Sequence, residues 1–186
     1  LGQEVVPNSG CGSWLLEPQS TNLITYSEDF SEWTKTGGTT VSATNILSPS
    51  GEDNGANITG LNGSGSNDLR FGTSINPSSK TYTASVFLKG SGTLRMQMSN
   101  NIDDAGSRIL TLSSSWVRYE FTYTFNATTS YLSLTLDDSG GTATSYDVWG
   151  AQIEQQSYAT SYIPTQGAAS TRLQDIANNS GNASLI

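Results

Sequence analysis

The sequence contains no histidine, and this absence excludes several kinds of chemistry at once. Neither a Ser-His-Asp nor a Cys-His catalytic arrangement can be assembled, and the usual zinc sites lose their imidazole ligands. Cys11 is the only cysteine, so the chain forms no internal disulfide. Gly10 and Gly12 flank Cys11, which favours a turn at this position over a reactive nucleophile.

Charge is also scarce. Charged residues make up 13% of the chain, and acidic residues outnumber basic ones by 16 to 8. A net charge of −8 removes the attraction that drives binding to nucleic acids and to anionic membranes. No stretch approaches the roughly 20 apolar residues that a membrane-spanning helix requires. We therefore expect no nucleic-acid partner and no membrane insertion, and the Ser-, Thr- and Asn-rich surface suits an extracellular protein.

Sustained helical periodicity is missing, and alternation with a period of two is present instead. Strand-like runs are separated by Gly, Ser and Asn clusters at a spacing of roughly 8 to 12 residues, as in all-β sandwiches and barrels. Apolar and polar residues alternate in runs that begin at Tyr82, Leu94, Val117 and Leu132, and Tyr146–Glu154 closes the set. The predicted fold class is therefore all-β, a two-sheet antiparallel β-sandwich of the jelly-roll type.

The run Val117–Phe125 is the strongest strand candidate, because its alternate residues are all large and apolar. If five such side chains are buried at about 1.5 to 3 kcal/mol each, this strand anchors the core by itself. Weaker strand candidates, expected to supply edge strands and loops, lie at 22–26, 39–43, 54–58 and 68–71.

The same pattern divides the chain into three parts. We assign residues 1–21 to an extended N-terminal segment that packs on the sandwich. The sandwich itself occupies 22–165, and its last part, from Tyr158 to Pro164, is expected to lie as an extended strip against the sheets. The polar stretch 166–186 is predicted to be a linker to a following domain.

Several residues resemble a known family of jelly rolls. Asn22-Leu23-Ile24, followed by Phe30 and Trp33, is similar to the opening of galactose-binding-like carbohydrate-binding modules of the family 4, 9 and 22 type. The strand Tyr82–Gly90 and the later Trp116-x-x-Tyr119 resemble the rest of that pattern. The resemblance implies a jelly-roll sandwich that binds a polysaccharide or a cell-surface glycan.

A second likeness is longer. The segments Leu15–Trp33, Val148–Thr165 and Gly167–Arg172 resemble a domain of bacteriophage tail and fibre proteins and of related bacterial surface proteins. Together with the central strands, this likeness covers nearly the whole chain. Its motifs are structural rather than chemical, so it implies the fold and a virion or extracellular location more than it implies a particular ligand.

The family resemblance also implies roles for tryptophans and calcium. In such modules the residues matching Trp33 and Trp116 brace the two sheets, so we expect both in the core, whereas Trp149 is open between core and ligand. Relatives often hold a structural calcium through an aspartate on the closing strand, but Val148–Gly150 offers no carboxylate there. No other cofactor is expected, and the candidates that remain for a weak calcium site are Glu28, Asp29, Asp147 and Glu154.

The candidate ligand residues alternate with the core-facing apolar residues of their strands. If these strands are neighbours in one sheet, they present guanidinium, amide and ammonium groups beside an aromatic ring. Such planar donors and acceptors orient sugar hydroxyls, and stacking on a ring adds affinity. Each of these residues can equally be an ordinary solvated side chain. The full set, including two residues at the rim of the 100–107 loop and the tryptophan of the closing strand, is Arg70, Phe87, Lys89, Arg95, Gln97, Asn100, Arg108 and Trp149.

The sequence thus favours a non-catalytic glycan-binding module of a phage fibre, tail or related surface protein that mediates attachment to polysaccharide. One alternative is a structural or oligomerising fibre or capsid-decoration domain, for example a homotrimer, without sugar binding. Another is an accessory binding module of a polysaccharide-degrading enzyme. A hydrolase that uses carboxylates alone would need a pair such as Asp103-Asp104 or Asp137-Asp138, but their turn-like settings favour local backbone hydrogen bonding.

Overall fold

The computed structural model describes the chain at residues 4–5, 13–14, 16–42, 46–100, 105–126 and 130–176. Cys11, Asp103-Asp104 and the part of the predicted linker beyond residue 176 lie outside these ranges. In the described ranges the one helix is a single 3-10 turn, η1 (Phe30–Glu32). No helix among these residues has the length and apolar character needed to cross a membrane.

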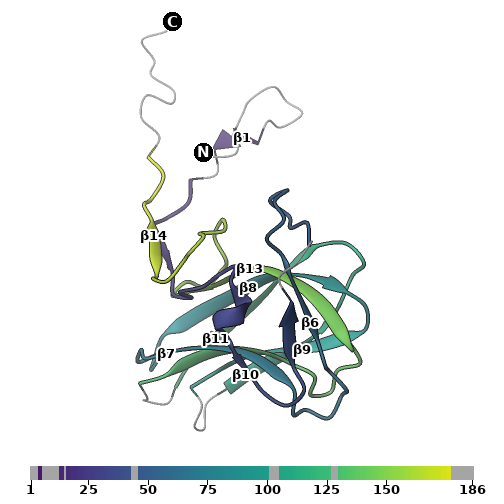
Figure 1. Ribbon diagram of the computed structural model, residues 1–186. Helices are drawn as coiled ribbons and strands as arrows, with labels where there is room; N and C mark the ends of the chain where they lie inside the picture. Colours follow the sequence, from purple (N-terminus) through teal and green to yellow (C-terminus); the bar gives the residue numbers. More distant parts are fainter. Residues whose placement is uncertain are drawn as a thin grey trace, which may run out of the picture.

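Two five-stranded antiparallel sheets face each other, as Figure 1 shows. We name them the β12 sheet and the β13 sheet after their central strands. The β12 sheet has the strand order β10 (Ala105–Thr111), β9 (Thr93–Ser99), β12 (Leu132–Asp137), β7 (Asp68–Thr73), β4 (Thr34–Lys35). The β13 sheet has the order β11 (Val117–Thr124), β8 (Thr81–Gly90), β13 (Ser145–Glu154), β6 (Ala56–Thr59), β5 (Thr40–Ser42). The predicted two-sheet antiparallel jelly-roll sandwich is confirmed.

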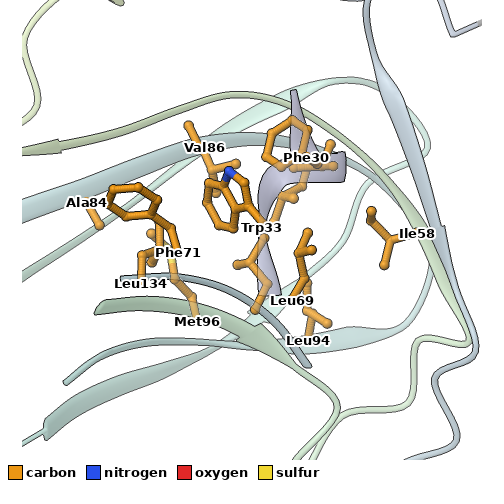
Figure 2. Packing of buried hydrophobic residues seen from close by; sticks show 14 of the residues in the cluster. Phe30, Trp33, Ile58, Leu69, Phe71, Ala84, Val86, Leu94, Met96 and Leu134 are labelled. Atoms are coloured by element: carbon orange, nitrogen blue, oxygen red, sulfur yellow. The ribbon is translucent and has the colours of Figure 1, made fainter. Parts of the chain in front are cut away.

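The core lies between the sheets and consists of the inward-facing residues of the central strands. Trp33, only 2% exposed, sits in its middle and packs against Phe30 and Phe71, with ring centroids 5.1 and 5.7 Å away (Figure 2). The core position predicted for Trp33 is therefore confirmed. The alternating runs of β8, β9 and β12 are buried as predicted, at Tyr82, Ala84, Val86, Leu88, Leu94, Met96, Met98, Leu132, Leu134 and Leu136.

The aromatic run of β11 does not anchor the core by itself, and that prediction was wrong. β11 is an edge strand that pairs with β8 on one side only. Its apolar side chains do face the core, but Val117 is 38% exposed and Tyr119, Phe121 and Tyr123 are half-buried. Only Phe125, just beyond the strand, is fully buried. An edge strand overhangs the sandwich, so its side chains lose less surface than those of a central strand.

The weaker strand candidates hold more varied positions than predicted. β4 and β5 are edge strands, but β6 and β7, which cover the candidates at 54–58 and 68–71, lie one place inside the edge of their sheets. Of the candidate at 22–26, only Asn22 belongs to a strand, β3 (Ser20–Asn22).

The two ends of the described chain are tied to each other. β3 pairs with β14 (Ser170–Arg172), and this two-stranded ribbon stands at one end of the sandwich (Figure 1). The Asp175 N–H donates to the Glu17 carbonyl oxygen at 2.9 Å, and the Glu17 N–H donates to the Asp175 carboxylate at 3.1 Å. Arg172 forms an ion pair with the Glu17 carboxylate. The sequence did not predict this pairing, which joins residues of the proposed linker to the N-terminal segment. A second short ribbon joins β1 (Glu4–Val5) to β2 (Ser13–Trp14).

A buried carboxylate holds the loop between β6 and β7. Asp138, directly after β12, is fully buried and accepts backbone hydrogen bonds from Asn62, Gly63, Gly65 and Asn67, and a fifth from the Asn67 side chain. Burial alone would raise the pKa of this carboxyl, but the N–H groups outweigh burial and lower the pKa to about 2. Asp138 therefore shapes a loop distant in sequence, whereas its turn-like setting predicted local backbone hydrogen bonding.

Replacing Asp138 by Asn is expected to destabilise the fold and to flatten its acid dependence. The carboxamide has one acceptor oxygen and turns an NH2 group toward N–H donors, so the free energy of unfolding at pH 7 should fall by about 2 to 4 kcal/mol. Because folding lowers the pKa of Asp138, its carboxylate stabilises the fold at pH values above its ordinary pKa of about 3.9. This contribution of about 2.5 kcal/mol to the free energy of unfolding is lost as the pH falls toward 2. Denaturant unfolding of both proteins from pH 6 to pH 2 measures this. Parallel stability curves for the two proteins would contradict it.

Candidate functional site

The predicted ligand residues do not share one face, because their strands belong to different sheets. β8 pairs with β11 and β13, and not with β7 or β9. The hypothesis of a single mixed face was therefore wrong. On the outward side of the β12 sheet lie Arg70, Arg95 and Gln97, and on the outward side of the β13 sheet lie Phe87, Lys89 and Trp149.

The two predicted rim residues do not extend either set. Asn100 follows β9 directly and is fully buried, so it is not a surface residue. Arg108 is exposed, but it lies opposite Met96 in the β10–β9 pair. Since Met96 faces the core, Arg108 belongs to the inward row of an edge strand, on the other side of the sheet from Arg95.

We call the outward face of β7, β12 and β9 the β12 face. Its central strand carries short side chains. The outward residues of β12, Ser133, Thr135 and Asp137, are short and buried, with 1%, 7% and 2% of their surface exposed. Longer side chains flank them on both sides. Arg70 of β7 and Gln97 of β9 lie directly opposite Thr135, and Arg95 of β9 lies opposite Asp137.

An ion pair fixes Arg95 on this face. Its Nε donates to both carboxylate oxygens of Asp137, at 2.9 and 3.0 Å, and the Ser139 N–H donates to the same carboxylate at 2.8 Å. Burial raises the pKa of Asp137 more than these hydrogen bonds lower it. In the described ranges no residue accepts a hydrogen bond from the Nη groups of Arg95, whose side chain is 28% exposed. The guanidinium is thus oriented while its outer donors stay available.

Two polar side chains beside this pair also lack partners within the described residues. Among the residues that the structure describes, neither the Gln97 amide nor the Thr135 hydroxyl makes a side-chain hydrogen bond. They face each other across the β12–β9 pair. A donor–acceptor amide and a hydroxyl on adjacent strands can together bind a vicinal pair of hydroxyl groups.

An aromatic ring completes the β12 face, and the sequence analysis did not select it. Tyr131 precedes β12 in the outward row of Ser133, and its ring lies across Gly72 of β7. A Cβ at Gly72 would collide with the Tyr131 hydroxyl oxygen and come within 2.6 Å of the attached ring carbon. Only glycine allows the ring to lie there. The alternation of Tyr131 with Leu132 was the available signal for its outward direction, but the contact with Gly72 comes from strand pairing.

The outward aromatic residues of the β13 sheet largely cover one another. Trp149, only 6% exposed, lies between Phe87 and Tyr162, with ring centroids 5.3 and 4.7 Å away. Gly150 follows with a φ of +61° at the bulge of β13, and this conformation turns the strand beneath Tyr162. Trp149 is therefore a packed residue of the outer layer.

Trp116 is not in the core, and this prediction was wrong. It precedes the edge strand β11 and is half-exposed. Its indole N–H donates to the backbone oxygen of Leu47, 3.0 Å away, in the loop between β5 and β6. The residue after it, Val117, takes the inward position, so Trp116 points outward from the β13 sheet.

The four carboxylates proposed for calcium lie in different hydrogen-bonding environments. Asp29 caps η1 by accepting from the Ser31 N–H, and Asp147 pairs with Lys89. The other two, Glu28 and Glu154, each accept hydrogen bonds from hydroxyl groups. Within the described ranges no three Asp, Glu or Cys side chains gather into a metal-binding group. The four residues therefore do not meet in one site, and calcium binding stays a prediction.

Because the Tyr131 ring lies over Gly72, we expect substitutions at these two positions to have coupled effects on the free energy of unfolding. Gly72→Ala in the native background should destabilise the protein by about 1 to 3 kcal/mol, because the added methyl group displaces the ring. In a Tyr131→Ala background the clash is absent, and the same change should stabilise by about 0.5 to 1 kcal/mol, since alanine loses less entropy than glycine in a strand. A double-mutant cycle by denaturant unfolding measures both steps. Equal effects in the two backgrounds would show that the ring does not lie over Gly72.

No protein-family model matches the chain, and no curated protein sequence matches it. Solved structures do. A Clostridium thermocellum xylanase 10B chain with CBM22-1 and GH10 modules, complexed with xylohexaose, superposes with a TM-score of 0.58 and 14% identity, over 79% of this chain and 30% of that chain. A family 4 carbohydrate-binding module (CBM4) has a TM-score of 0.52 and 19% identity, over 73% of this chain and 94% of that chain.

A phage protein shares the architecture too. The enzymatically active domain of bacteriophage CBA120 tailspike protein 4 superposes with a TM-score of 0.50 and 9% identity, over 70% of this chain and 21% of that chain. At such identities the likeness concerns the fold. The chain therefore has the jelly-roll β-sandwich fold that is found in carbohydrate-binding modules.

Proposed function

We propose that the chain is a non-catalytic glycan-binding module and that the β12 face is its binding surface. The observation that carries the proposal is the group formed by Arg95, Gln97 and Thr135, whose outward hydrogen-bonding groups lack partners in the described ranges, on the same face as the Tyr131 ring. Sugars are bound by a few oriented polar groups together with an apolar ring surface. The fold shared with carbohydrate-binding modules supports the same conclusion.

The dimensions of the β12 face favour a stretch of polysaccharide over a single sugar. Adjacent strands lie about 4.8 Å apart, so a row that crosses β7, β12, β9 and β10 extends over roughly 15 Å. That row contains Arg70, Thr135, Gln97 and Ser107. Arg95 and Asp137 neutralise each other, so this pair does not require an anionic ligand.

Asp137 and Asp138, the adjacent pair at the end of β12, are poor candidates for catalysis. Asp138 is fully buried and receives five hydrogen bonds, while Asp137 is 2% exposed and paired with Arg95. Hydrolysis by two carboxylates requires both to reach the glycosidic bond from opposite sides. Binding without turnover is therefore the function that these residues favour.

We place the module in a phage fibre, tail or related surface protein, where it attaches the particle to a polysaccharide. The likeness of Leu15–Trp33 and Val148–Thr165 to phage domains supports this context, and the tailspike fold is consistent with it. The xylanase chain, which combines such a module with a GH10 module, supports the alternative of an accessory module of a polysaccharide-degrading enzyme.

A structural role within a fibre is the second candidate, and the terminal ribbon favours it. Three apolar side chains next to β3 and β14 are well exposed: Leu16 at 51%, Leu173 at 74% and Ile176 at 69%. Exposed apolar groups that lie together are typical of surfaces that contact another polypeptide. Light scattering of the isolated chain would show an oligomer, such as the predicted homotrimer, if this role dominates.

Affinity electrophoresis in gels that contain xylan, mixed-linkage glucan, mannan, galactan or a bacterial capsular polysaccharide tests the proposal. At least one polysaccharide should retard the folded protein. Gln97→Ala and Tyr131→Ala should each weaken that retardation about fivefold to tenfold, which corresponds to one lost hydrogen bond or stacking contact.

Thr124→Ala, an exposed change on the opposite sheet, is the control and should migrate like the native protein. Absence of retardation in every gel would contradict glycan binding. Retardation that survives both β12-face changes would place binding on another surface.

A further inference from the structure

A second polar row crosses the other outward face of the molecule. Trp116, Lys89, Asp147 and Asn57 follow one another across four neighbouring segments of the β13 sheet. Lys89 lies opposite Asp147, and Asp147 lies opposite Asn57. Trp116 precedes Val117, the partner of Leu88, and so lies beside Lys89. All four side chains point away from the core, on the opposite side of the sandwich from Arg95 and Gln97.

Direct contacts connect these four side chains to one another. Asn57 Nδ2 donates to Asp147 Oδ1 at 2.8 Å, and Lys89 Nζ lies 3.3 Å from Asp147 Oδ2. The same Nζ lies 5.9 Å from the centroid of the Trp116 ring, whose N–H is held by Leu47. A lysine ammonium is ordinarily free to move on its long stem. Here a carboxylate and an aromatic face hold it, so the entropy lost on binding a ligand is reduced.

This row borders a depression of about 360 Å³. Lys89, Asp147 and Asn57 line it, together with small residues that include Ser114 and Ser145. Such a volume is within the range of about 300 to 1,000 Å³ that small-molecule sites occupy. The side chains of Lys89 and Asp147 keep 40% and 16% of their surface exposed, so a ligand in the depression can reach both.

We propose that this depression, the Trp116 site, binds a neutral sugar at the end of a glycan chain. The ammonium of Lys89 donates, the carboxylate of Asp147 accepts, and the Asn57 amide does both, which matches the hydroxyl groups of a sugar. The Lys89–Asp147 pair is neutral as a whole, so the site has no net charge to attract a uronic or sialic acid. The Trp116 ring, next to Lys89, holds the ammonium at the border of the depression.

The position of the depression selects a terminal sugar. It is lined by Gly90 and Ser91, where β8 turns into β9, and by Ser114, just before β11. The depression thus lies at the end of the sheet, where strands give way to turns, whereas the β12 face lies along the middle of its strands. The inference goes beyond the proposed function, because two separate sites on opposite faces would let one molecule bind two glycan chains at once.

Titration of the full chain with methyl glycosides of glucose, galactose, mannose and xylose, followed by 1H–15N NMR, tests the Trp116 site. The indole N–H signal of Trp116, assigned by its loss in Trp116→Phe, should shift with at least one glycoside. Asp147→Asn should weaken that binding at least about tenfold, because it removes a charge-assisted acceptor and the anchor of Lys89.

Gln97→Ala is the matched control on the opposite face and should leave the shift unchanged. No shift of the Trp116 signal with any of the four glycosides would overturn the proposal, and so would an unchanged affinity in Asp147→Asn. The result is independent of the polysaccharide gels, since loss of retardation in Gln97→Ala reports on the β12 face alone.

Discussion

The burial of one side of each central strand is the constraint on which the rest of the molecule depends. Leu132, Leu134 and Leu136 must leave water, and in a strand this forces Ser133 and Thr135 to the other side. The same rule holds in β9, where the burial of Met96 and Met98 turns Gln97 outward. The polar faces of this sandwich are therefore a consequence of its core.

Local contacts then convert the outward rows into shaped surfaces. On the β12 face, Asp137 orients Arg95, and Gly72 provides the space in which Tyr131 lies across β7. On the opposite side, Asp147 orients Lys89 in the same way. In both places a carboxylate neutralises a cation and fixes it while leaving other donors exposed. This arrangement suits hydroxyl-rich ligands better than strongly charged ones.

The sequence predicted the directions of side chains well, because alternation is a local property. The buried runs from Tyr82, Leu94 and Leu132 are confirmed, and so is the outward direction of Arg95 and Gln97. The sheet to which a strand belongs is not a local property, because a strand with one apolar side can pair with any of several other strands. Phe87 and Lys89 were for that reason grouped with residues of the opposite sheet.

Strand order explains the other differences. Trp116 and the β11 ladder look like core residues in sequence, but their burial depends on whether the strand has neighbours on both sides, and β11 has one. Tyr131 acquires its place only through Gly72 of another strand. Asp138 is a further case, because its turn-like setting indicated a loop but not that four residues of a distant loop would surround it.

The most direct test of the account is to map where a bound oligosaccharide lies. Oligosaccharides cut from whichever polysaccharide retards the protein should be titrated into the labelled chain, with backbone and side-chain amide shifts followed by NMR. The account predicts that the largest changes fall on β7, β9 and β12 and include the side-chain NH2 group of Gln97. Changes confined to the loops or to the terminal ribbon would contradict it.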